Sequence, residues 1–263
     1  MSKFLVKGRP TLTVMIQART PERASELIKK GVEGGADAFA MQVDQLERKY
    51  RTEECYKKLF GEMNGKPLYV TDYRTNMSEG MSDEELAEEL LVLARCGAAL
   101  IDVMGDLYCP SKDEITIEPE ADAKQREIIN KIHSYGAEVL MSSHTYRLLT
   151  WDEVLRTAKI QSERGADIIK IVTAANTEKE LYDNFEITAR LKKELEKPFL
   201  FLCVGEYCKK HRLMAPIITN DIYLCVAEQD EFSTPAQPLL KTAKQLVDLI
   251  YGGQTYESNP CKR

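Results

Sequence analysis

The sequence predicts an α/β protein that folds as a single (β/α)8 TIM barrel. Short apolar runs alternate along the chain with amphipathic charged segments, a pattern typical of βα units around a parallel sheet. Eight such units lie between residues 11 and 251, a length that suits a closed barrel. No G-x-G-x-x-G turn follows the first apolar run, which continues as Gln17-Ala18-Arg19-Thr20-Pro21, so an open doubly wound sheet is the less favoured alternative.

Each unit is recognised by its apolar run and by the helix signals after it. Thr20-Pro21 is typical of a helix start, Ser82 with Glu85 fits a capping box, and Gly165 suits a helix end. The predicted strands are Leu12–Ala18, Ala38–Val43, Leu68–Tyr73, Leu100–Met104, Val139–Ser143, Ile168–Thr173, Phe199–Val204 and Ile222–Ala227. The predicted helices are Pro21–Gly34, Thr52–Met63, Asp83–Cys96, Ala121–Tyr135, Trp151–Arg164, Glu178–Leu195, Lys210–Ile218 and Gln237–Tyr251, with a short N-terminal lead and a C-terminal tail outside this core.

Composition narrows the class of protein. The 263 residues are 43% hydrophobic and 30% charged, with a net charge of −6 and no long basic run, which argues against nucleic acid as a partner. No apolar stretch reaches the roughly 20 residues of a membrane span, and the start lacks a signal peptide. Seven scattered cysteines without C-x-x-C, and three histidines without ligand spacing, predict reduced thiols in a cytoplasmic protein and no metal site.

Lys170 is the most informative residue, because it interrupts the apolar strand Ile168–Thr173. Burial disfavours the charged amine unless a carboxylate pairs with it. A lysine moved toward neutrality is a nucleophile suited to forming an imine with a carbonyl compound. The alternatives are a lysine that reaches solvent from the strand end and one that is paired to a carboxylate.

A barrel places functional groups at the C-terminal ends of its strands. His144 ends the fifth strand, next to the sixth strand with Lys170, and could act as the proton-transfer residue. Arg74 and Arg212 offer guanidinium groups suited to a carboxylate, although a surface ion pair is the commoner role for an arginine. Ser233 and Gln237 could bind a polar substrate, or Ser233 could cap the last helix.

These residues in this order resemble the type I 3-dehydroquinate dehydratase family, from Leu12 to Tyr251. The matching phrases are Asp167-Ile168-Ile169-Lys170-Ile171, Met141-Ser142-Ser143-His144, Thr71-Asp72-Tyr73-Arg74, His211-Arg212-Leu213 and Ser233-Thr234-Pro235-Ala236-Gln237. The resemblance implies that Lys170 forms a Schiff base with the substrate ketone. It also implies that His144 moves the protons and that Arg74, Arg212, Ser233 and Gln237 bind substrate.

Three departures from the family pattern concern the pocket. The second strand ends Ala40-Met41-Gln42-Val43-Asp44 where the family has E-x-R-x-D, so Gln42 replaces the substrate-binding arginine. The fourth strand ends Ile101-Asp102-Val103-Met104 instead of I-D-L-E. The family glutamate beside the lysine falls on Ser78, and Glu79, one residue later, is the expected catalytic carboxylate.

The predicted function is therefore that of a cofactor-free Schiff-base lyase of the shikimate pathway, removing water from a hydroxy-ketone carboxylate such as 3-dehydroquinate. A class I aldolase shares the barrel lysine and is one alternative. A divergent paralogue that binds a quinate-like ligand is the other, because both charges of the second strand are lost. The resemblance also implies a homodimer in the cytoplasm.

Overall fold

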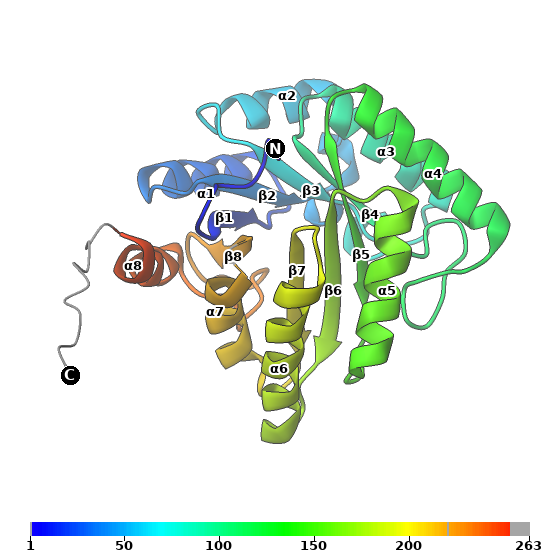
Figure 1. The fold of residues 1–263 in the computed structure, drawn as a ribbon. Helices are drawn as coiled ribbons and strands as arrows, with labels where there is room; N and C mark the ends of the chain where they lie inside the picture. Colours follow the sequence, from blue (N-terminus) through cyan, green and yellow to red (C-terminus); the bar gives the residue numbers. More distant parts are fainter. Residues whose placement is uncertain (1, 220, 253–263) are drawn as a thin grey trace, which may run out of the picture.

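A computed structural model of the chain describes residues 2–219 and 221–252. Eight parallel strands form one sheet in the order β7-β6-β5-β4-β3-β2-β1-β8, and the helices that connect them lie outside it (Figure 1). The strands are β1 Thr11–Ile16, β2 Ala38–Gln42, β3 Leu68–Thr71, β4 Leu100–Met104, β5 Glu138–His144, β6 Ile168–Ala174, β7 Phe199–Val204 and β8 Ile222–Val226. The predicted (β/α)8 barrel is confirmed, with β7 and β8 at the two ends of the hydrogen-bonded ladder.

The helices follow the strands as predicted, with shifts at several ends. They are α1 Pro21–Glu33, α2 Glu53–Gly61, α3 Asp83–Arg95, α4 Pro119–Ser134, α5 Trp151–Arg164, α6 Glu178–Glu194, α7 Cys208–Thr219 and α8 Leu240–Tyr251. Short 3-10 turns occur at Val43–Gln45, Arg48–Tyr50 and Asn76–Ser78. The last helix begins at Leu240 and not at Gln237, because residues 233–237 form a turn closed by the bond from Gln237 N–H to Thr234 O at 2.9 Å.

The interior of the barrel is formed by alternate residues of the strands. Its buried apolar side chains include Met15, Ala40, Tyr69, Leu140, Val172 and Leu202, while the intervening residues face the helices. Successive side chains of a strand point to opposite faces of the sheet. Every second residue therefore fills the barrel (the inward parity), and the residues between them pack against the helices outside. Polar residues of the inward parity therefore come together at the C-terminal ends of the strands.

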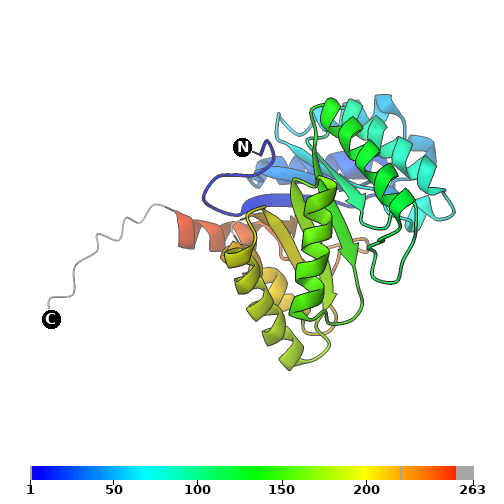
Figure 2. The same cartoon turned by 45° about the vertical axis from the view of Figure 1, so that its right-hand side comes forward.

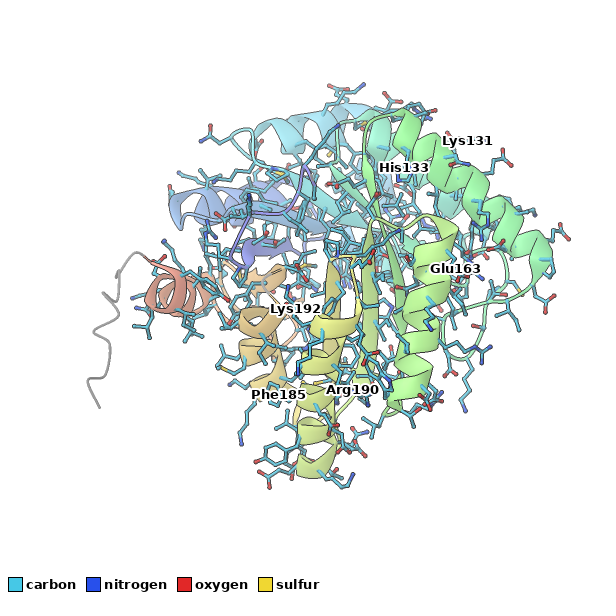
Figure 3. The ribbon with its side chains drawn as sticks, in the orientation of Figure 1. Lys131, His133, Glu163, Phe185, Arg190 and Lys192 are labelled. Carbon is cyan, nitrogen blue, oxygen red and sulfur yellow. The ribbon has the colours of Figure 1, made fainter. Side chains whose placement is uncertain are left out.

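The outer helical layer is held by apolar packing and by charges on its surface. The guanidinium of Arg190 on α6 lies 3.9 Å from the ring centre of Trp151 on α5, which joins neighbouring helices (Figure 3). Figure 2 shows the same layer from another side, with α4 and α5 side by side. None of the described helices is long and apolar enough to cross a membrane. The six described cysteines form no disulfide, and Cys261 and the predicted C-terminal tail lie outside the described residues.

One buried arginine fixes the base of the long segment between β4 and α4. Arg164 at the end of α5 donates to Gly105 O and Gln125 Oε1 at 2.9 and 2.8 Å, and it also donates to Thr116 O. Its Nε donates to Asp122 at 2.8 Å. Both ends of the segment are therefore tied to the same side chain.

We expect Arg164→Leu to lower the free energy of unfolding by about 2–4 kcal/mol, because buried acceptors lose their donor. The matched control is Arg126→Leu, since Arg126 also pairs with Asp122, at 2.9 Å, but is exposed. Arg126→Leu should lower the free energy of unfolding by less than about 1 kcal/mol. Urea denaturation of both variants tests this, and equal losses would contradict the anchoring role of Arg164.

Candidate active site

The site is built around Lys170, which lies in the middle of β6 and points into the barrel. Its register partner on β5 is Ser142, and the side chain is almost fully buried at 6% exposure. The Nζ atom lies 2.5 Å from the hydroxyl of Tyr73, 3.1 Å from that of Tyr69, and 3.1 Å from Asp102 Oδ2. Of the alternatives left open by the sequence, Lys170 is thus a lysine paired to a carboxylate inside the barrel.

Asp102 on β4 is the counter-charge of this lysine. Both tyrosine hydroxyls donate to the same oxygen, Oδ2, with a distance of 2.7 Å for Tyr73. Burial alone would raise the pKa of Asp102, but the charge of Lys170 and the hydroxyl donors outweigh it and hold this pKa below its usual value. Burial, and next the charge of Asp102, raise the pKa of both tyrosines well above the ordinary value, so both stay protonated.

His144 lies on the same side of the barrel mouth, at the end of β5. It is two residues beyond Ser142, so its side chain has the same parity as that of Lys170 across the ladder. Its ring packs edge-on against Tyr73, with 5.1 Å between ring centres. Tyr73 therefore contacts both the lysine and the histidine.

The carboxylate that holds His144 is Glu114. One oxygen of Glu114 lies 2.6 Å from His144 Nδ1 and 3.0 Å from its backbone nitrogen. An ionised carboxylate can accept hydrogen bonds but cannot donate them, so this contact favours the tautomer with a proton on Nδ1 and leaves Nε2 free to accept one. Glu114 lies in the segment between β4 and α4, with a left-handed backbone at φ 47°.

Glu79, the expected catalytic carboxylate, does not occupy this place. Its side chain is exposed, and it makes no hydrogen bond or ion pair with Lys170 or His144. The reason lies in its neighbour, because the Ser78 hydroxyl is buried against Asp72 at 2.5 Å and receives a bond from Arg51 at 2.9 Å. These bonds anchor the loop after β3 with Glu79 on the outside. No spacing in the sequence pointed to Glu114, since it lies far from the family motifs.

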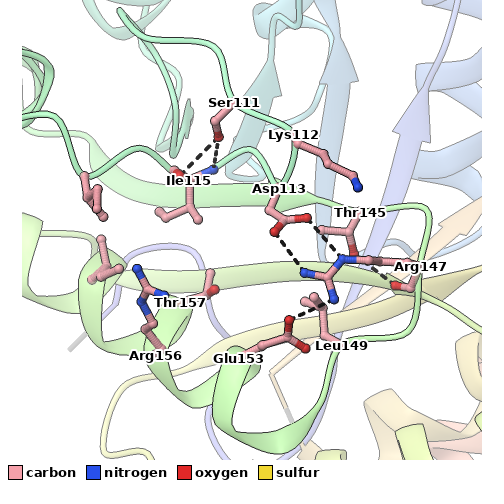
Figure 4. A pocket seen from close by; sticks show the side chains of 12 residues that line it. Ser111, Lys112, Asp113, Ile115, Thr145, Arg147, Leu149, Glu153, Arg156 and Thr157 are labelled. Atoms are coloured by element: carbon pink, nitrogen blue, oxygen red, sulfur yellow. Dashed lines mark hydrogen bonds and ion pairs between the residues drawn. The ribbon is translucent and has the colours of Figure 1, made fainter.

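The segment that carries Glu114 is fixed by ion pairs next to a cavity of about 280 Å³ (Figure 4). Asp113 pairs with Arg147 at 2.9 Å, and the same guanidinium pairs with Glu153 at 2.9 Å. The Ser111 hydroxyl bonds to the backbone of Ile115 as both donor and acceptor. The residue before Glu114 is thus tied to the loop after β5, which begins directly after His144.

Arg74, predicted to bind substrate, is already engaged by two carboxylates. Its Nε and Nη2 donate to Asp83 at 2.7 and 2.9 Å, Nη2 also donates to Asp106 O at 3.0 Å, and Nη1 donates to Asp106 Oδ1 at 2.8 Å. Despite partial burial, these bonds raise the pKa of Arg74 above its usual value. These four bonds within the protein leave one of the five N–H donors of the guanidinium, and substrate binding by Arg74 stays a prediction.

Arg212 has the opposite environment. It lies in the first half of α7, within the predicted helix Lys210–Ile218, and it is 8% exposed. Its Nε donates to Cys203 O at 2.9 Å, and no carboxylate among residues 2–219 and 221–252 forms an ion pair with it. Burial lowers the pKa of Arg212. A buried guanidinium without a counter-ion is suited to an anionic ligand.

His211 is fully buried beside Arg212. Its Nε2 lies 2.9 Å from the Thr188 hydroxyl, and its ring packs against Phe185 and Phe201. Burial lowers its pKa to about 4. A neutral histidine here fixes α7 on α6, and with it the position of Arg212.

The remaining predicted residues lie in the loop after β8 and at the end of β2. The Ser233 hydroxyl accepts from Asp230 N–H at 2.7 Å and donates to Asp230 O at 2.8 Å, so it closes a turn and does not cap α8. Gln237 is buried, and its Oε1 has no partner among the described residues. Gln42 accepts from Gln17 at 2.9 Å and donates to Asp44 at 3.2 Å.

Comparison with known proteins shows the family to which this chain belongs. A family model described as type I 3-dehydroquinase matches residues 12–254. The chain belongs to the type I 3-dehydroquinase family. A 3-dehydroquinate dehydratase of Alkaliphilus oremlandii is 29% identical over 142 residues, a match that covers 53% of this chain and 55% of that relative. The match therefore spans about half the length of the curated relative.

Solved structures of the type I 3-dehydroquinase family share the fold. The enzyme from Clostridium difficile, determined with covalently modified comenic acid, has a TM-score of 0.77 at 21% identity, covering 93% of this chain and 94% of that chain. The 3-dehydroquinate dehydratase from Geobacillus kaustophilus has a TM-score of 0.76 at 15% identity, covering 95% and 93%. At these identities the likeness establishes the barrel.

Within the type I 3-dehydroquinase barrel, the uncharged second strand is part of the interior. Ala40 is fully buried and pairs in register with Tyr69 of β3, the residue that bonds to Lys170. Gln42 has the same inward parity. The corner that carries charge in the family is therefore occupied here by neutral amides, and Asp44 accepts from Asn76 and Thr75 at 2.6 and 2.9 Å.

We predict that His211 makes stability fall in mild acid. Its pKa is about 4 when folded against 6.5 for the free side chain, so the unfolded chain binds its proton first. The free energy of unfolding is therefore unaffected by protonation of His211 above about pH 6.5. It decreases by about 3 kcal/mol as the pH falls from there to 4. Denaturant titrations at several pH values, on wild type and His211→Gln, measure it. Parallel pH curves for the two proteins would contradict the assignment.

Proposed function

We propose that this chain is a Schiff-base dehydratase acting on 3-dehydroquinate or a closely related hydroxy-ketone carboxylate. The observation that carries the proposal is the contact of one residue, Tyr73, with both Lys170 and His144 at the mouth of a type I 3-dehydroquinase barrel. An amine and an imidazole in this arrangement supply the nucleophile and the proton carrier of imine chemistry.

The proposed reaction begins when the neutral amine of Lys170 attacks the substrate ketone. Loss of water from the adduct gives an imine, which acidifies the carbon beside it. Nε2 of His144 then removes a proton from that carbon and returns it to the β-hydroxyl, which leaves as water. Hydrolysis of the conjugated imine releases the enone and restores Lys170.

Glu114 supports the role of His144 by holding its Nδ1–H and its backbone N–H at once. This double contact fixes both the tautomer and the plane of the ring, as a carboxylate partner does for a catalytic histidine. The bond to Glu114 also stabilises the imidazolium that exists between the two proton transfers. Glu114 is thus a positioning residue of the proposed reaction.

Substrate binding is assigned to Arg212, Gln237, Ser233 and Gln42. The guanidinium of Arg212, which has no counter-ion within the described part of the chain, suits the substrate carboxylate. The Gln237 Oε1, which has no partner there either, suits a hydroxyl donor. Gln42 offers an amide where the family has an arginine. The proposal therefore places the carboxylate at α7 and the hydroxyl groups toward β2.

A binding protein without turnover is the second candidate, and specific observations favour it. Asp83 and Asp106 accept most of the N–H donors of Arg74, and Lys170 donates all three of its N–H bonds within the protein. In that case a quinate-like carboxylate would bind at Arg212 without reacting.

Homodimer formation and a cytoplasmic location belong to the same proposal. The family resemblance supports a dimer, and the free cysteines suit a reducing compartment. Sedimentation of the purified protein at micromolar concentration tests the dimer.

We expect 3-dehydroquinate to give a new ultraviolet enone absorbance with wild type and none above buffer with Lys170→Met. His144→Gln should lower kcat by about 10²–10⁴-fold, because it removes the proton carrier. Thermal unfolding confirms that each variant is folded. If folded wild type binds the substrate but produces no enone, the binding-protein alternative replaces the dehydratase.

We predict that Glu114→Gln lowers kcat by about 10²-fold, because an amide can present the wrong group to Nδ1 and change the tautomer. KM should change little, since Glu114 acts through His144. Glu79→Gln is the matched control and should leave both constants unchanged. Steady-state enone kinetics measure them, and a loss in the Glu79 variant with none in the Glu114 variant would reverse the assignment.

A further inference from the structure

The bonds around Lys170 raise the question of which proton leaves before the amine can react. An ammonium group has three N–H bonds and no lone pair. All three are donated, to Tyr73, Tyr69 and Asp102. The acceptor that takes a proton therefore decides the direction in which the lone pair of the neutral amine first points.

Tyr73 is the acceptor on the open side of this group. Tyr69 lies within β3 and Asp102 within β4, and both are fully buried inside the barrel. Tyr73 follows the end of β3 by two residues, is only partly buried, and contacts the ring of His144. Loss of the proton shared with Tyr73 leaves the lone pair pointing at the Tyr73 hydroxyl, on the mouth side of the amine, and this hydroxyl turns away when a carbonyl compound reaches Nζ.

We propose that Tyr73 is a catalytic residue that activates Lys170 by proton relay. Its hydroxyl oxygen, 2.5 Å from Nζ, accepts a proton from Lys170 while its own proton passes to Asp102 Oδ2 across 2.7 Å. One N–H bond and one O–H bond break, one O–H bond forms on each of Tyr73 and Asp102, and the electron pair stays on Nζ. The relay rests on the proposed role of Lys170 as the nucleophile.

Asp102 becomes easier to protonate as Lys170 loses its charge, which favours the proposed transfer. Burial alone favours the protonated carboxyl, and only the neighbouring charge and donors hold the pKa of Asp102 down. When Lys170 becomes neutral, its charge no longer opposes protonation of Asp102. Tyr73 itself stays neutral throughout, because its pKa is raised.

Reductive methylation of Lys170 tests the relay without any substrate of the enzyme. Formaldehyde forms an imine with the neutral amine, cyanoborohydride reduces it, and peptide mass spectrometry gives the rate. Lys179, whose side chain is 84% exposed, is the internal standard in the same sample. The rate is followed against pH, since Tyr69, Tyr73 and Asp102 face Nζ and the His144–Glu114 pair lies beyond Tyr73.

We expect Tyr73→Phe to slow methylation of Lys170 about 100-fold at neutral pH relative to Lys179, with recovery at higher pH. Tyr69→Phe is the matched control, because it removes a hydroxyl from the same nitrogen and the same carboxylate on the inner side. It should slow the reaction less than about threefold. Both variants keep the aromatic ring, and circular dichroism confirms their folding.

Two results would overturn the relay: a Tyr73→Phe protein that methylates at the wild-type rate, and equal slowing by the two variants. Failure of the proposed function has a different signature. If Lys170 methylates with the predicted dependence on Tyr73 while 3-dehydroquinate yields no enone, the relay stands and the dehydratase assignment fails.

Discussion

The buried ion pair between Lys170 and Asp102 is the interaction on which the rest of this structure depends. A lysine inside a barrel is costly unless a partner compensates its charge, and removing either member of such a pair commonly costs about 3–5 kcal/mol. Here the carboxylate comes from β4, two strands away from β6 in the ladder, and two tyrosines complete its shell. The pair therefore fixes the positions of β4 and β6 relative to each other. It also requires polar side chains in the interior between them.

The ion pair with Asp102 also keeps Lys170 charged, whereas imine formation needs a neutral amine. An ion-paired ammonium cannot attack a carbonyl group, so the lysine must lose a proton to its own shell. The shell supplies a neutral hydroxyl toward the mouth and a carboxylate whose ionisation depends on the charge beside it. The interactions that make burial tolerable are thus the same interactions that can release the nucleophile.

The positions of strand residues could be predicted from the sequence, and those of loop residues could not. Lys170, His144 and Gln42 lie at the predicted strand positions, because the alternation of a parallel strand determines which side chains face the interior. The surroundings of Glu79 and Arg74 could not be predicted from spacing. Both residues follow β3 in a loop, where the buried Ser78 hydroxyl anchors the backbone and two aspartates engage the guanidinium of Arg74. Glu114 became visible only in three dimensions, since a left-handed residue in a 14-residue connection has no periodic signal.

The most direct test of the account is borohydride reduction of wild type in the presence of 3-dehydroquinate, followed by peptide mapping. A covalent adduct is expected on the peptide that contains Lys170, and it should be absent in Lys170→Met. An adduct on another lysine, or none at saturating substrate, would contradict the central claim that this buried lysine is the nucleophile.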